Sequence, residues 1–86
     1  MKIEFTYHVL NEKIPLLKKL NWNITKAKIK QTIKNPIWRG ITKEGQLTAM
    51  SLVNNKYILR VVYDKESDII KVITIHIAKR GRYESR

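Results

Sequence analysis

The sequence predicts an α+β domain in which two helices pack on one face of a mostly antiparallel sheet. Two observations predict it. Apolar residues recur with helical spacing in two segments of the first half, whereas four segments of the second half are rich in β-branched and aromatic residues. Short turns join those four segments, so we expect an antiparallel β-meander. With 86 residues the chain has room for one core, and we expect residues 1–86 to form a single domain.

A short N-terminal strand is expected within residues 1–8, where apolar and polar residues alternate. The next segment has apolar residues on one helical face: Leu10, Ile14, Leu17 and Leu20. Proline is tolerated only in the first turn of a helix. Pro15 therefore predicts a helix that begins near Asn11 or Glu12.

The second helix follows a break at residues 21–23. Thr25 is a suitable N-cap residue, and Ile24 before it can pack on Ile29 as a hydrophobic staple. The helix is expected to end at Lys34, because the following Asn-Pro pair disfavours helical geometry.

The chain beyond the helices predicts four strands, at residues 37–42, 47–53, 57–64 and about 69–79. We expect residues 65–68 to form the turn of the last hairpin, with Asp64 opposite Ile69. In that register Arg60 lies opposite Ile73. Both faces of the hairpin are apolar enough to be covered, so the sequence leaves open which face the helices take.

Charge is the strongest compositional signal. Lys and Arg number 18 against 7 Asp and Glu, a formal net charge of +11. This excess favours a polyanionic partner, which can be nucleic acid, an acidic protein or an anionic membrane, or else a solubilising lysine-rich surface. We expect no membrane binding, because the basic residues do not form an amphipathic helix with a bulky apolar face.

Several classes of site are not expected. The chain has no cysteine, and its two histidines, His8 and His76, fall in separate elements without metal-binding spacing. We therefore expect neither a metal nor another cofactor. No apolar stretch resembles a signal peptide or a membrane span, since the longest, residues 69–78, is interrupted by polar residues. A cytoplasmic location is expected.

Two groups of cations are candidates for RNA contact. Three lysines lie on one face of the second predicted helix: Lys26, Lys30 and Lys34. Like charges at this spacing repel, and an anionic partner would relieve the repulsion, although a simple solvated face explains them equally well. The second group follows the last strand and combines cations with an aromatic ring: Lys79, Arg80, Arg82 and Tyr83.

Arg60 is unusual because it interrupts an apolar strand. A buried arginine needs a carboxylate partner, access to water or a role in a site. Arginine suits bidentate phosphate recognition, and tyrosine offers a stacking face. The simple register places Arg60 and Arg80 on opposite faces of the sheet unless the strand bulges or ends early.

The second half of the chain resembles a known superfamily. Arg-Val-Val-Tyr at residues 60–63, a short acidic turn, an Ile/Val-rich strand and Lys-Arg-Gly-Arg-Tyr at residues 79–83 resemble the C-terminal half of RelE-like ribonuclease toxins and their BrnT-like relatives. The helical half, with Asn-Ile-Thr at residues 23–25 and Asn-Pro at residues 35–36, resembles the same superfamily. The likeness implies a RelE-like fold and an endoribonuclease of a toxin–antitoxin pair.

The resemblance also implies roles for individual residues. Arg60 matches the strand arginine of the family, Arg80 the arginine at the end of the sheet, and Tyr83 the C-terminal tyrosine. The sequence departs from the RelE pattern at residues 47–51, where the ribosome-dependent enzymes have lysines and this chain has none. That departure weakens the expectation of catalysis more than that of RNA contact.

Catalysis would be metal-independent attack of a 2′-hydroxyl on the adjacent phosphorus. Arg60 and Arg80 can stabilise the phosphoryl charge, and His76, His8 or Tyr83 would have to move the proton. A lone histidine on a sheet face is, however, more often a packed and hydrogen-bonded residue.

Two functional hypotheses result. The first is a toxin-like endoribonuclease, and the alternative is a non-catalytic nucleic-acid or protein interaction module with the same fold. The expected partners are RNA, free or on the ribosome, an acidic antitoxin protein and a second copy of the chain.

Overall fold

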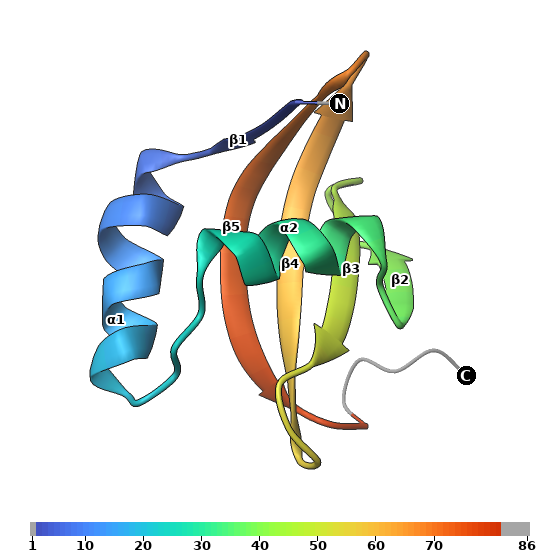
Figure 1. Cartoon of the computed structure of the whole chain (residues 1–86). Coiled ribbons are helices and arrows are strands. Elements are labelled where there is room, and N and C mark those ends of the chain that lie inside the picture. Colours follow the sequence, from blue (N-terminus) through green and yellow to red (C-terminus); the bar gives the residue numbers. More distant parts are fainter. Residues whose placement is uncertain (1, 82–86) are drawn as a thin grey trace.

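The computed structural model describes residues 2–81. Its centre is a five-stranded sheet with the strand order β1-β5-β4-β3-β2 (Figure 1). The strands are β1 (Lys2–Phe5), β2 (Trp38–Ile41), β3 (Leu47–Leu52), β4 (Tyr57–Glu66) and β5 (Ile69–Lys79). Strands β2 to β5 form an antiparallel meander, and β1 pairs with β5 in parallel. The fold is therefore α+β with a mixed sheet.

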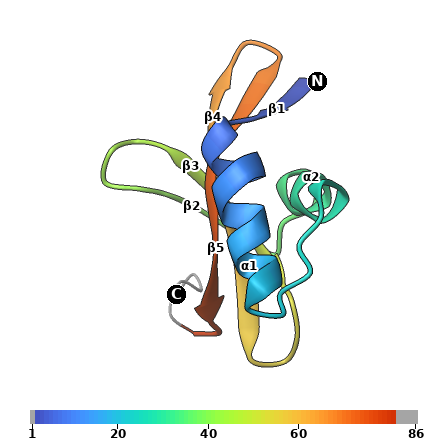
Figure 2. The same ribbon diagram turned by 90° about the vertical axis from the view of Figure 1, so that its left-hand side faces the viewer.

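Three helical segments connect β1 to β2: η1 (His8–Lys13), α1 (Ile14–Lys19) and α2 (Lys26–Lys34). Segments η1 and α1 are continuous and lie beside β5, whereas α2 crosses the sheet over β3 and β4 (Figures 1 and 2). Both helices contribute to one core, which includes Val9 and Leu17 from the first and Ile29 and Ile33 from the second. None of the helices in residues 2–81 is long and apolar enough to cross a bilayer.

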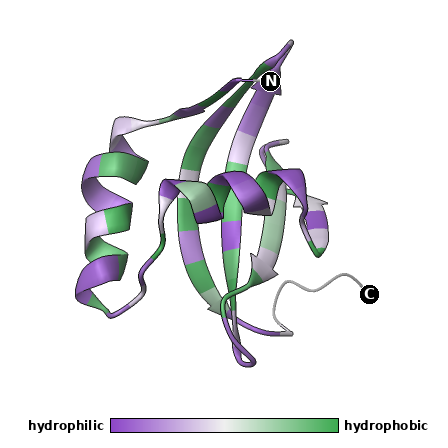
Figure 3. Cartoon of the chain, in the orientation of Figure 1, coloured by the Kyte–Doolittle hydropathy of each residue, from purple (hydrophilic) through white to green (hydrophobic). Residues whose placement is uncertain are grey.

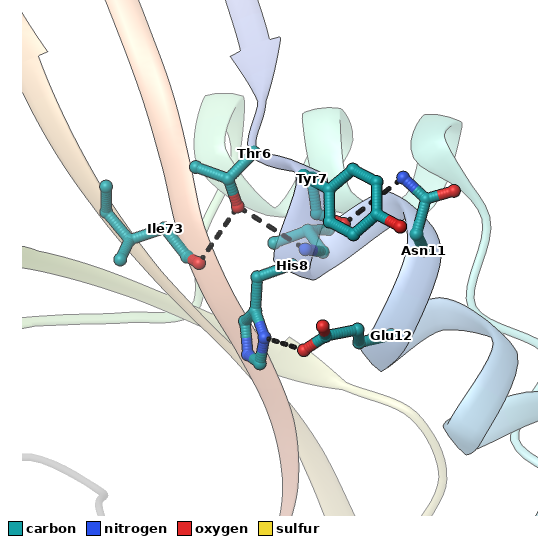
Figure 4. Close-up of polar contacts among 7 residues, drawn as sticks. Thr6, Tyr7, His8, Asn11, Glu12 and Ile73 are labelled. Carbon is teal, nitrogen blue, oxygen red and sulfur yellow. Dashed lines mark hydrogen bonds and ion pairs between the residues drawn. The ribbon is translucent and has the colours of Figure 1, made fainter.

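The first helix begins at His8, earlier than the position of Pro15 predicted. Its first turn is π-helical, and Thr6 holds that turn in place. The Thr6 hydroxyl accepts a hydrogen bond from the Val9 amide at 3.3 Å and donates one to the Ile73 carbonyl at 3.2 Å (Figure 4). The contact with Val9 is local, but the contact with Ile73 is tertiary, and helical spacing alone did not predict the extra turn.

The second helix matches its prediction closely. Thr25 is the N-cap, and its hydroxyl accepts a hydrogen bond from the Lys28 amide at 3.1 Å. Ile24 and Ile29 are both buried in the core. The helix ends at Lys34, as the following Asn-Pro pair predicted.

The predicted register of the last hairpin is wrong. Ile69 pairs with Glu66 rather than with Asp64, and only a two-residue turn remains between β4 and β5. The polar residues at the end of β4 suggested a loop, but they continue the ladder. Ser67 in the turn has a φ of 55°, the left-handed geometry that such a tight turn requires.

A bulge shifts the register a second time. Val62 pairs with Thr74 and Tyr63 with Val72, so Ile73 is the extra residue on β5. As a result Arg60 pairs with His76, and the expected pairing of Arg60 with Ile73 is wrong.

The bulge also determines which side chains face the helices. Leu59, Val61 and Tyr63 of β4 belong to the core beneath the helices, together with Val72 and Ile75 of β5. Because side chains alternate along a strand, the intervening residues of β4 face the other way. Among residues 2–81, that second face carries no helix, and we call it the open face (Figure 2). Ile58 and Val62 on this face are nevertheless buried, at most 4% exposed, whereas Arg60 is partly exposed.

Candidate nucleic-acid interface

A row of four side chains crosses the open face. Trp38 of β2 pairs with Met50 of β3, Met50 pairs with Arg60 of β4, and Arg60 pairs with His76 of β5. Directly paired residues of neighbouring strands project from the same face. The sheet therefore aligns an aromatic ring, a thioether, a guanidinium and an imidazole across four strands.

Arg60 and His76 are hydrogen-bonded within this row. Arg60 Nη1 lies 3.0 Å from His76 Nε2, and both residues are partly buried. A guanidinium has donors but no acceptor, so Nη1 must donate and Nε2 must accept. The imidazole in this contact is therefore neutral and carries its proton on Nδ1.

The end of β5 carries further cations, beyond His76 on the same strand. Lys79 pairs with Tyr57, and the amide of Arg80 donates to the Lys56 carbonyl at 2.8 Å, so the ladder continues to Arg80. A broad hollow of about 740 Å³ lies there, lined by Asn55, Lys56, Tyr57, Lys79, Arg80 and Gly81. This arrangement concentrates three cations around one end of the hairpin.

The bulge and the corrected register remove the expected conflict between Arg60 and Arg80. Arg60 pairs with His76, and strand alternation along β5 puts Arg80 on the same side of the sheet as His76. The two arginines are thus on one side, contrary to the simple register.

The three lysines of α2 do not join this group. Lys26, Lys30 and Lys34 are exposed on the helix that covers the opposite face of the sheet. Lys26 Nζ also lies 5.8 Å from the ring centroid of Phe5, a cation–π contact within the fold. A single RNA strand on the open face would not reach these lysines without turning around an edge of the sheet.

The other histidine is also separate. His8 Nδ1 lies 2.7 Å from Glu12 Oε1 within η1, at the exposed surface of that helix (Figure 4). The contact joins two residues one helical turn apart, as is common for i, i+4 pairs. Of the two histidines, His76 is the one aligned with Arg60.

Two of the predicted site residues, Arg82 and Tyr83, lie outside the described residues. Conversely, the sequence did not predict Lys56 and Trp38 as site residues. Lys56 was detectable, because it follows an Asn-Asn turn in which the Asn54 side chain accepts hydrogen bonds from the next amides. Trp38 was not detectable, because its alignment with Arg60 depends on the register of two strand pairs.

Strand β3 carries hydroxyl and apolar side chains and no cations. Met50 belongs to the row on the open face, and Ser51 faces α2, where its hydroxyl lies 2.7 Å from that of Thr32. Within residues 2–81 no cluster of three or more His, Asp or Glu side chains can hold a metal ion. The chemistry available on the open face is that of guanidinium, imidazole and aromatic groups.

Comparison with protein-family models, with curated proteins and with solved structures found no match for this chain.

Proposed function

We propose that this domain binds single-stranded RNA on the open face of its sheet and cleaves it without a metal ion. The observation that carries the proposal is the 3.0 Å contact of Arg60 with His76 on the open face. The cationic end of β5 lies further along the strand that carries His76. In such a pair the arginine can stabilise negative charge and the histidine can transfer a proton, and phosphodiester cleavage needs both. The net charge of +11 adds long-range attraction for RNA.

The proposed reaction is an internal phosphoryl transfer. A phosphate that binds Arg60 would turn the guanidinium donors toward itself and release Nε2 of His76. The imidazole then accepts the proton of the 2′-hydroxyl, whose oxygen attacks the adjacent phosphorus. The bond from phosphorus to the 5′-oxygen breaks, and the imidazolium returns the proton to that oxygen. The products are a 2′,3′-cyclic phosphate and a 5′-hydroxyl.

Arg80 is proposed to stabilise the phosphoryl charge from the end of β5. The Arg80 amide donates to the Lys56 carbonyl beyond the end of β5, so the backbone that carries the guanidinium is held in place. Arginine binds phosphate oxygens in a planar, bidentate geometry and stays charged at neutral pH. Lys56 would hold a neighbouring phosphate of the strand. Lys79 pairs with Tyr57, which alternates with the core residue Leu59, so it projects from the helix-covered face.

A non-catalytic RNA-binding module is the second candidate, and one observation favours it. The lone pair of His76 Nε2 accepts a hydrogen bond from Arg60, so it is occupied until the guanidinium moves. If the pair stays intact when RNA binds, His76 orients Arg60 for phosphate contact and transfers no proton.

Cleavage of defined RNAs separates the two candidates. Wild type, His76→Gln and Arg80→Ala are incubated in EDTA with structured and single-stranded RNA, with and without ribosomes. Lys43→Ala serves as the matched control, because Lys43 is an exposed lysine of the β2–β3 turn. The proposal expects cyclic-phosphate products that disappear in His76→Gln and Arg80→Ala but not in the control. Binding without any His76-dependent cleavage assigns the module instead.

The wider biological setting is part of the same proposal. The arginine positions and the order of elements support a RelE/BrnT-like toxin that an acidic antitoxin neutralises, with the cytoplasm as the place of action. Co-expression with the protein encoded by the neighbouring reading frame tests this. Relief of growth inhibition by that protein supports the toxin, whereas growth inhibition unaffected by it contradicts the pairing.

A further inference from the structure

A second cationic hollow lies on the helix-covered side of the sheet, at the edge formed by β2. Its volume is about 340 Å³, within the range of small-ligand sites. Its walls include Lys34 at the end of α2, Arg39 of β2 and Lys65 of β4. The other lining side chains include Ile33, Tyr63 and Ile70, which are buried residues of the core.

The strand register explains why these cations converge. Arg39 pairs with Ala49, which pairs with Val61, and both of these are fully buried beneath the helices. Lys65 pairs with Ile70, another core residue. Arg39 and Lys65 therefore project from the helix-covered face, where the last turn of α2 supplies Lys34.

The three cations are not balanced by acidic side chains. The residues that line the hollow include no Asp or Glu. In the described part of the chain, the ion pairs are Lys2–Glu4 and His8–Glu12, and neither involves this hollow. Three positive charges around an apolar floor repel one another, and a bound anion would relieve that repulsion.

We infer that this hollow binds a nucleotide, with its phosphate on Lys34, Arg39 and Lys65 and its base on the apolar floor. Arginine and lysine together match a phosphate dianion in charge and donor geometry. Ile33, Tyr63 and Ile70 close the bottom of the hollow with apolar groups, although each is at most 4% exposed, and this apolar lining suits a weakly polar group such as a base. The nucleotide can be free or can be the 5′-phosphorylated end of an RNA strand.

This site is separate from the proposed RNA-cleaving site. Arg60 and His76 lie on the open face, whereas the hollow lies on the helix-covered face. Loss of either site therefore leaves the other intact, and the inference holds whether or not the open face cleaves RNA.

The test is an NMR titration of ¹⁵N-labelled protein with AMP, adenosine and inorganic phosphate. AMP is expected to shift the amides of Gly40, Thr48 and Lys65, which border the hollow. Adenosine, which lacks the phosphate, is expected to bind at least about tenfold more weakly, as the loss of charge-assisted hydrogen bonds implies. Phosphate alone is expected to shift the same amides only at higher concentration.

Variants make the assignment specific. The double variant Arg39→Ala/Lys65→Ala changes two exposed side chains, and it is expected to weaken AMP binding by about tenfold or more. The double control Lys19→Ala/Lys43→Ala removes the same charge from two exposed lysines that line neither hollow and is expected to change binding less than about twofold. Equal losses in the two double variants would mean unspecific attraction and would overturn the inference.

Titration with RNA distinguishes a free nucleotide from the 5′-phosphorylated end of an RNA strand as the ligand. A short oligonucleotide with a 5′-phosphate or a 5′-hydroxyl is titrated into the Arg80→Ala variant. Phosphate-dependent shifts of Gly40 and Lys65 support an RNA end as ligand, whereas shifts with AMP alone support a free nucleotide. A site that neither AMP nor phosphorylated RNA shifts, or that binds a polyglutamate peptide more tightly than both, overturns the inference and points to an acidic protein.

Discussion

Arg60 Nη1 donates to His76 Nε2 across neighbouring strands at 3.0 Å, so the guanidinium of Arg60 is positioned by an imidazole nitrogen that carries no proton. The contact exists because a bulge after Val62 changes which residue of β5 lies opposite Arg60. The bulge in the β4–β5 pairing is therefore what brings together the two side chains of the proposed chemistry on the open face.

The first prediction concerns the tautomer of His76. Because Nε2 must accept from Arg60, the neutral ring should carry its proton on Nδ1. Long-range ¹H–¹⁵N NMR at neutral pH is expected to show an unprotonated Nε2, and Arg60→Met should reduce that preference because methionine cannot donate. His8, which contacts a carboxylate through Nδ1, is the internal control. A proton on Nε2 of His76 in the wild type contradicts the assignment.

The second prediction concerns a buried hydroxyl pair between α2 and β3. Thr32 Oγ1 donates to the Lys28 carbonyl at 2.8 Å, so its single proton is used and Ser51 Oγ, 2.7 Å away, must donate to it. Ser51→Ala therefore leaves Thr32 bonded and should cost only about 0.5–1.5 kcal/mol. Thr32→Val removes the acceptor of a buried Ser51 and should cost about 1–3 kcal/mol. Urea unfolding measures both, and a larger loss in Ser51→Ala would contradict the donor assignment.

Local signals predicted the elements of this fold well. The N-cap at Thr25 and the helix end at Lys34 depend on residues within one turn, and both are confirmed. The start of the first helix depends instead on Thr6, which bonds to Ile73 on a strand that lies 67 residues further along the chain. Sequence spacing contains no information about that contact.

Pairing between distant strands limited the prediction of the candidate site. Arg60 was predicted as a site residue because it interrupts an apolar strand. Its partner His76 could not be identified, because two register changes separate the observed pairing from the simplest one. A single extra residue in β5 reverses the side-chain alternation of half a strand, and sequence patterns do not reveal where a bulge falls.

The third prediction concerns Gly40, where β2 and β3 approach closely. A Cβ atom at this position would lie 2.9 Å from Thr48 Oγ1, and Thr48 is buried. Gly40→Ala is therefore expected to destabilise the protein by about 1–3 kcal/mol through overpacking. The double variant Gly40→Ala/Thr48→Ala should be more stable than the sum of the two single changes predicts. Thermal or urea unfolding checks this, and strict additivity would show that the crowding is not with Thr48.

The fourth prediction concerns the salt dependence of RNA binding. If about six cations contact phosphates of a single strand, the slope of log K against log salt should be near −4. Arg80→Ala should make that slope less steep by about 0.7 if this arginine contacts one phosphate. Lys43→Ala, an exposed change in the β2–β3 turn, should leave the slope unchanged. Fluorescence anisotropy with a labelled single-stranded RNA measures all three proteins, and a wild-type slope near zero would remove RNA as the partner of the open face.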